Sequence, residues 1–164
     1  MTLIPPPDWH QPRLRWSPIR QSGDPANLSN NASMLKGQLH HVELWVPDFD
    51  RASASLGWLL ESLGYTIHQS WENGTSWLFG DTYVVVEQSP ALVEGPHDRM
   101  RPGLNHLAFH AGTVSECDDL IAESLKHGWD LLFADRHPNA GGSDHHAGYL
   151  VNADGFEVEL VAEP

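Results

Sequence analysis

Three stretches decide the fold of this chain: LHHVELWVPD (residues 39–48), GLNHLAF (103–109) and NADGFEVEL (152–160). Each alternates apolar with polar or histidine side chains, the pattern of a strand with one face in a protein core. The first two stretches begin a strand in the same way, with a leucine two positions before a histidine. Their similarity indicates an internal repeat, which constrains a fold more than any single strand does.

The remaining elements fall into place around these stretches. The first half predicts a helix over residues 49–63, bounded by Asp48 and Gly64 as cap and stop, and the second half predicts a helix over residues 113–127. The predicted strands are 39–46, 66–71, 75–79, 82–88, 104–110, 130–134, 147–152 and 156–161. The chain therefore reads β-α-β-β-β twice, at a period of roughly 65 residues. We expect an α+β domain over residues 37–164, with modules at about 39–88 and 104–162.

Composition narrows the classes of function. The 164 residues carry 9 Lys and Arg against 22 Asp and Glu, a formal net charge of −13. A chain this acidic is poorly suited to neutralising nucleic-acid phosphates or binding anionic membranes. The lone Cys117 leaves no internal disulfide, so we expect a cytoplasmic protein. The proline-rich residues 1–36 predict an extension that is disordered or lies on the surface.

Histidines and carboxylates occupy matching places in the two halves. His41 shares a strand face with Glu43 and Trp45, opposite the apolar residues of that strand, so His40 should point away from the site. His106 begins the second half at the equivalent position, and the last strand places Glu157 and Glu159 on one face. Two histidines with one or two carboxylates suit a divalent metal that keeps open positions for water or substrate.

These residues and the doubled pattern resemble the vicinal oxygen chelate superfamily, over Leu39 to Glu163. That group includes glyoxalase I, fosfomycin and bleomycin resistance proteins, methylmalonyl-CoA epimerase and extradiol dioxygenases. The resemblance implies two βαβββ modules whose curved sheets form an open cup around one metal ion. It also implies frequent homodimers, in some of which each site is assembled from two chains.

By position, the resemblance assigns His41, His106 and Glu159 as metal ligands, with Glu87 as a fourth ligand of the glyoxalase type. It implies one divalent ion (Ni, Co, Mn, Zn or Fe) and a carboxylate, Glu87 or Glu159, that moves the proton. Two alternatives remain open. Glu87 could simply be solvated, as a glutamate on an edge strand ordinarily is, and Glu157 could be the ligand in place of Glu159.

Two further features bear on catalysis. The loop over residues 135–146 is long and contains three histidines, so His145 is a candidate acid/base or substrate-binding group; the alternative is a solvated polar loop. Tyr149 precedes Glu159 by ten residues on the neighbouring strand. This spacing partly matches the extradiol dioxygenase signature, although Ala153 replaces the usual proline and Tyr149 could be a core aromatic.

Three alternative functions, each involving a small molecule, are consistent with the sequence. The first is a metal-dependent lyase or isomerase of the glyoxalase type, which the resemblance and the candidate ligands favour. The second is an Fe(II) ring-cleaving dioxygenase, favoured by Tyr149 and the histidine-rich loop and disfavoured by Glu87. The third is a binding or resistance protein without catalysis. Few arginines stand near predicted cup positions, which disfavours a phosphonate substrate.

Overall fold

The computed structural model describes residues 36–93 and 95–163. The expectation of an extended or surface-lying segment before the domain therefore lies outside the described residues, apart from Lys36. Within the described ranges, no helix combines the length and apolar character that a membrane crossing requires.

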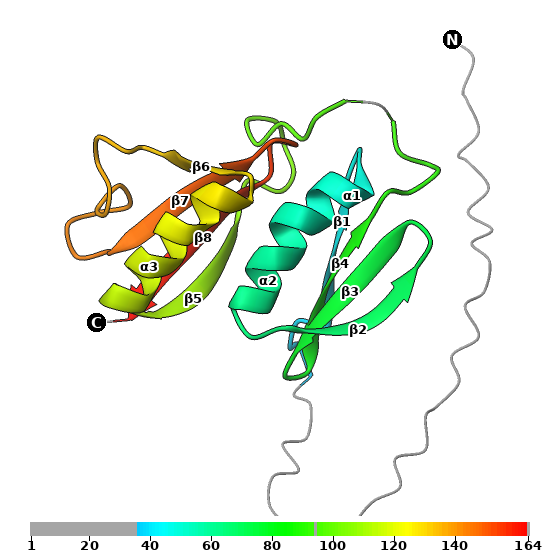
Figure 1. Ribbon diagram of the computed structural model, residues 1–164, viewed down its shortest axis with the longest axis horizontal. Coiled ribbons are helices and arrows are strands. Elements are labelled where there is room, and N and C mark those ends of the chain that lie inside the picture. Colours follow the sequence, from blue (N-terminus) through cyan, green and yellow to red (C-terminus); the bar gives the residue numbers. More distant parts are fainter. Residues whose placement is uncertain (1–35, 94, 164) are drawn as a thin grey trace, which may run out of the picture. The chain divides into compact units, whose positions relative to one another are not determined.

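The first module is a four-stranded sheet with one helical segment on it (Figure 1). Its strands lie in the order β1-β4-β3-β2, with β1 parallel to β4 and the other pairs antiparallel. The bounds are β1 His41–Trp45, α1 Phe49–Ala52, α2 Trp58–Ser62, β2 Thr66–Trp71, β3 Gly74–Phe79 and β4 Thr82–Glu87. This is the βαβββ unit expected from the sequence.

The second module repeats the arrangement, with β5-β8-β7-β6 as the strand order and β5 parallel to β8. Its bounds are β5 Leu107–Thr113, α3 Val114–Ser124, β6 Trp129–Leu132, β7 Ala147–Asn152 and β8 Glu157–Glu163. The doubled α+β architecture predicted from the sequence is confirmed, with two separate sheets and no closed barrel.

The helices begin where the sequence places their caps. The Asp48 side chain accepts a hydrogen bond from the Arg51 backbone N–H at 2.9 Å and so caps α1. A single π-helical turn over Ser53–Gly57 separates α1 from α2, so the predicted helix over 49–63 is continuous but not uniformly α-helical. Gly64 follows with φ +87°, the left-handed conformation that stops a helix at low cost for glycine.

The core lies where the apolar faces of the strands meet the helices. In β1, Leu44 is buried while His41 is exposed, which confirms the predicted alternation. Large side chains are also fully buried in other elements, including Trp77 of β3 and Trp129 of β6. The faces that carry the candidate ligands are therefore the faces opposite this core.

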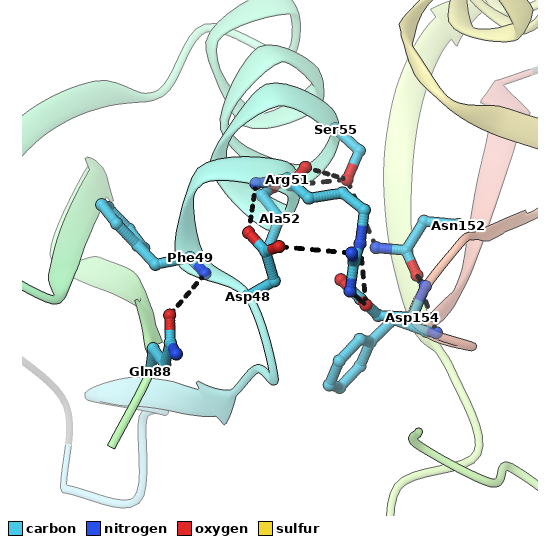
Figure 2. Close-up of polar contacts among 9 residues, drawn as sticks. Asp48, Phe49, Arg51, Ala52, Ser55, Gln88, Asn152 and Asp154 are labelled. Atoms are coloured by element: carbon cyan, nitrogen blue, oxygen red, sulfur yellow. Dashed lines mark hydrogen bonds and ion pairs between the residues drawn. The ribbon is translucent and has the colours of Figure 1, made fainter. Parts of the chain in front are cut away.

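The two modules contact each other through a polar cluster at the start of α1 (Figure 2). The Arg51 guanidinium pairs with Asp154 of the second module and with Asp48 of the first. Asn152 donates to the Ser55 hydroxyl at 3.3 Å, and the Trp129 indole donates to the Ser55 carbonyl at 3.2 Å. Because Asp154 is buried, this charged contact needs its cationic partner in place.

The segment between the modules folds back onto the second one. The His97 ring stacks on Phe156 with centroids 4.6 Å apart, and its backbone N–H donates to the Asp154 carbonyl at 3.0 Å. Gly155 has φ +84°, and a Cβ at this position would collide with the His97 carbonyl. Glycine is therefore required here for the close approach of the connecting segment.

The structure corrects the predicted start of the second module's first strand. The strand begins at Leu107 rather than at residue 104, because local hydrogen bonds hold the preceding backbone in another conformation. The His97 ring bonds to the Leu104 carbonyl at 3.0 Å, and the Asn105 amide donates to the Arg99 carbonyl at 3.0 Å. His106 therefore stands just ahead of the strand.

Candidate metal and substrate site

Glu159 is the centre of a polar cluster on the second module. Its Oε1 lies 2.6 Å from Nε2 of His145, and its Oε2 lies 3.2 Å from Nε2 of His106. Tyr149 is its direct cross-strand partner on β7, and the Tyr149 hydroxyl interacts with the same carboxylate. Four of the residues singled out from the sequence thus meet here, although each comes from a different segment of the module.

The cluster keeps Glu159 ionised. Burial by itself would raise the pKa of this carboxyl group, but hydrogen bonding with Tyr149 and His145, together with attraction from His145 and His106 in their protonated forms, outweighs burial, and the pKa is lowered. The pKa of Tyr149 changes in the opposite direction: burial and the neighbouring Glu159 carboxylate raise it to about 12. The cluster therefore offers an anion to a bound cation at neutral pH.

The hydrogen bonds of Asn105 indicate how the His106 ring is oriented. The Asn105 amide nitrogen donates to the Arg99 carbonyl, so its oxygen is the atom that faces Nδ1 of His106 at 2.8 Å. In the neutral ring, Nδ1–H must then donate to Asn105, which leaves the lone pair of Nε2 toward the Glu159 carboxylate. A nitrogen lone pair and a carboxylate oxygen that face each other suit a divalent cation.

The other acidic residues of β8 are engaged elsewhere. Glu157, the rival of Glu159, is 3% exposed and lies 2.9 Å from the Arg99 guanidinium. Glu163 is exposed and lies near His110. Of the acidic groups on this strand, Glu159 alone has a histidine nitrogen at both carboxylate oxygens: the candidate ligand His106 at one and His145 at the other.

His41 stands on the first module, on the exposed face of β1. Its ring stacks on Tyr83 of β4, with centroids 4.9 Å apart and planes 5° from parallel. His40 does not point away from it, contrary to the expectation, since the two Nδ1 atoms are 2.8 Å apart. The reason is that β1 begins at His41, so strand alternation does not extend to His40.

Strand register separates Glu87 from His41. His41 pairs with Tyr83, whereas Glu87 pairs with Trp45 at the other end of the same two parallel strands. Four residues of strand amount to about 13 Å, too far for two ligands of one ion. The pKa of Glu87 is raised, first by burial and then by the nearby charge of Glu43. Glu87 is thus placed beside Glu43 and Trp45, not beside His41.

No complete metal site is gathered within the residues that the structure describes: they hold no group of three His, Cys, Asp or Glu side chains arranged to bind an ion. The second module contributes the His106–Glu159 pair, and His41 belongs to the other module. A cavity of about 730 Å³ lies along β1 and the connecting segment; its walls include Glu43, Trp45 and Phe156 but none of the four predicted ligands.

Side-chain contacts hold the histidine-rich loop against the sheet and against helix α3. His145 binds Glu159, and the His146 ring contacts an Asp118 carboxylate oxygen at 2.8 Å. Gly141 lies so close to Tyr149 and His145 that a Cβ would come within 2.7 Å of each. The loop therefore covers the Glu159 cluster, and this accounts for the burial of a carboxylate on an otherwise open sheet face.

Three residues of this region were not found from the sequence: Arg99, Phe133 and Arg136. The Phe133 ring lies 5.7 Å from that of Tyr149, and both guanidinium groups approach it. Arg99 and Arg136 lie in segments without a strand or helix period, so periodicity gave no signal for them. Phe133 falls within the predicted strand 130–134, but β6 ends at Leu132 and Phe133 begins a turn instead. The positive φ of Phe133 becomes visible only in the folded chain.

Comparisons with known proteins agree with this architecture. Residues 40–149 match the model of the Glyoxalase/Bleomycin resistance protein/Dioxygenase superfamily. The chain is 40% identical over 125 residues to the uncharacterised protein YqjT of Bacillus subtilis (strain 168), which covers 76% of this chain and 98% of that protein.

Solved structures show the same fold. A glyoxalase-like protein from Bacillus halodurans has a TM-score of 0.74 and 40% identity, covering 78% of this chain and 97% of its own. A fosfomycin resistance protein from Listeria monocytogenes, in complex with Mn(II) and 1S,2S-dihydroxypropylphosphonic acid, has a TM-score of 0.56 and 17% identity, covering 78% and 91%. A lactoylglutathione lyase from Agrobacterium tumefaciens has a TM-score of 0.53 and 16% identity, covering 77% and 93%.

Proposed function

Because the chain belongs to the Glyoxalase/Bleomycin resistance protein/Dioxygenase superfamily, we propose that it is a divalent-metal-dependent enzyme of the glyoxalase type. It would act as a lyase or isomerase on a small molecule that is bound through two adjacent oxygens. The observation that carries the proposal is the His106–Glu159 pair: Nε2 of His106 lies 3.2 Å from Oε2 of Glu159, where the neutral ring and the ionised carboxylate can bind one cation together.

The proposed ligands are His41, His106 and Glu159. Imidazole and carboxylate donors of this kind suit Ni, Co, Mn, Zn or Fe(II). A bound ion would supply a Lewis acid that polarises a substrate carbonyl. The protein's own contribution is to hold this donor set: Asn105 fixes the His106 ring, and Tyr149 keeps Glu159 ionised and oriented.

Three other residues are proposed for catalysis or substrate contact. The His145 ring donates a hydrogen bond to Glu159 in the described arrangement, so the loop must move before this carboxylate oxygen can bind a cation. Tyr149 would keep its own hydroxyl group protonated beside the Glu159 carboxylate. Strand register separates Glu87 from His41, so it is not proposed as a fourth ligand; it is proposed as a proton-moving carboxylate for a substrate that extends from the metal along β1 to Glu43.

We further propose that the site is completed by a second copy of the chain in a homodimer. His41 contacts His40 and Tyr83 of its own module, and the described residues of one chain gather no set of three ligands. A two-fold dimer would bring His41 of one copy to His106 and Glu159 of the other, at two equivalent sites. The single Cys117 is buried, in keeping with a cytoplasmic location, which is likewise proposed.

An Fe(II) ring-cleaving dioxygenase is the second candidate. The observation that favours it is the contact of Tyr149 and His145 with the proposed ligand Glu159, since the sequence spacing alone only suggested that the three meet. The two candidates share their three ligands and differ in the metal. The identity of the bound ion therefore discriminates between them.

The proposal predicts about one divalent ion per chain in protein purified without a metal-binding tag, measured by elemental analysis. His106→Ala and Glu159→Gln should each lose the ion, because each removes one of three donors. His110→Ala is the matched control, since this histidine lies on β5 four residues after His106 but is exposed and outside the cluster.

The outcomes separate the candidates. Ni, Co, Mn or Zn supports the glyoxalase-type reaction, whereas iron supports the dioxygenase. If the wild-type protein takes up no ion even after incubation with each of these metals, both enzyme proposals fail and a binding protein remains. Equal metal content in His106→Ala and His110→Ala would rule out His106 as a ligand.

A further inference from the structure

A strained residue lies beside the Glu159 cluster. Phe133 directly follows β6 and has φ +54°, a left-handed conformation that is uncommon for a bulky side chain. Its carbonyl accepts backbone hydrogen bonds from Arg136 at 2.8 Å and from His137 at 2.9 Å, which hold the tight turn. Strain of this kind persists where the surrounding structure enforces it, often at ligand sites.

Two arginines from different segments converge on the Phe133 ring. The guanidinium carbon of Arg136 lies 4.6 Å from the ring centroid, and that of Arg99 lies 5.8 Å from it. Arg99 is neutralised by Glu157 at 2.9 Å. Within residues 36–93 and 95–163, no carboxylate lies within ion-pair distance of Arg136, and its side chain is exposed. A positive charge is thus held in place by an aromatic face and left open to solvent.

This charge adjoins the proposed metal ligands. The Phe133 and Tyr149 rings meet edge to face at 5.7 Å, and the Tyr149 and His106 rings meet edge to face at 6.1 Å. Tyr149 is in turn the direct cross-strand partner of Glu159. A molecule bound at Glu159 and His106 would therefore extend across Tyr149 toward the two guanidinium groups. The chain has a net charge of −13, so an arginine held beside the Glu159 cluster without an acidic partner among the described residues indicates a binding role.

We propose that Arg136, positioned by Phe133 and backed by Arg99, binds an anionic oxygen group of the substrate, such as a carboxylate. This inference rests on the proposed function, and it adds the substrate class: a small molecule with two adjacent oxygens at one end and a negative charge at the other. The planar guanidinium of arginine can bind a carboxylate with two parallel hydrogen bonds. Phe133 fixes the plane in which Arg136 presents them.

The test compares two probes that differ only in the anionic group: catechol and 3,4-dihydroxybenzoate. Binding to the metal-loaded full-length protein is measured by calorimetry. The carboxylate probe should bind about ten-fold more tightly, the usual gain from one charge-assisted contact. Arg136→Gln should abolish that preference. Arg101→Gln is the matched control, because Arg101 is an exposed arginine whose partner is Asp98.

Separate measurements keep this inference distinct from the proposed function. Metal content reports on the ligands alone. If no metal binds, the proposed function fails, and the anion site is tested on the metal-free protein by titration with benzoate and benzyl alcohol. There too, benzoate should bind more tightly, and Arg136→Gln should remove the difference. Equal affinity for charged and neutral probes, no binding of either carboxylate, or an unchanged preference in Arg136→Gln would overturn the inference.

Discussion

At the scale of single residues, the strand pattern and the internal repeat made some of the candidate site residues predictable. Alternation put Glu159 and Glu157 on one strand face, and the resemblance chose Glu159; His106, which stands just ahead of β5, was singled out by its place in the internal repeat. The structure places Glu159 and His106 3.2 Å apart. Arg99 and Arg136 lie in irregular segments, where no period tells which way a side chain points. Their meeting at Phe133 depends on the whole second module being folded.

Cys117 gives a prediction that depends on pH. Its thiol is fully buried and donates to the Leu160 carbonyl at 3.4 Å; burial, with a smaller effect of Asp118, raises its pKa from 9.0 to about 11. Between these values the unfolded chain has lost a proton that the native chain keeps. The free energy of unfolding should therefore fall as the pH rises above about 9.

Urea unfolding at pH 8, 9 and 10 measures this contribution, with Cys117→Ala as the reference that lacks it. The loss of stability with pH should be smaller in the variant. In addition, a thiol reagent at pH 8 should label the native protein far more slowly than the urea-unfolded protein. Equal labelling rates in the two states would show that the thiol is accessible.

At the scale of elements, alternation predicted which face of a strand is buried but not which residues of two strands stand opposite each other. The sequence offered Glu87 as the counterpart of Glu159. Strand register shows instead that Val85 is the counterpart of Glu159. Glu159 pairs with Ala108, two residues after His106, and Val85 pairs with Glu43, two residues after His41. Pairing between distant strands depends on turn and helix geometry, which the sequence pattern alone left open.

Helix α3 depends on its capping box. The Thr113 side chain accepts from the Glu116 backbone N–H, and the Glu116 carboxylate accepts from the Thr113 backbone N–H at 2.8 Å. Thr113→Ala should lower the free energy of unfolding by about 1 kcal/mol, since it leaves a backbone N–H without its partner. Thr113→Ser keeps the hydroxyl and should cost much less. Urea denaturation compares the two variants, and equal midpoints would show that the cap does not stabilise α3.

At the scale of the whole molecule, the internal repeat predicted two modules, and the structure confirms them. The contacts that join the modules could not be foreseen. Arg51 follows an ordinary helix cap, and Asp154 stands in what reads as a simple turn, yet the two form an ion pair across the modules (Figure 2). Both residues also fit purely local roles, so no sequence pattern singled out the pair.

The central claim is that the metal is held by His41 of one copy of the chain and by His106 and Glu159 of another. The most direct test mixes two inactive variants, His41→Ala and Glu159→Gln, by unfolding and refolding them together. Neither variant alone should retain the metal. In the mixture, half of the dimers are mixed and each has one intact site, so metal content should recover to about one quarter of the wild-type value. No recovery from a mixture that refolds into dimers, or full metal binding by His41→Ala alone, would contradict the account.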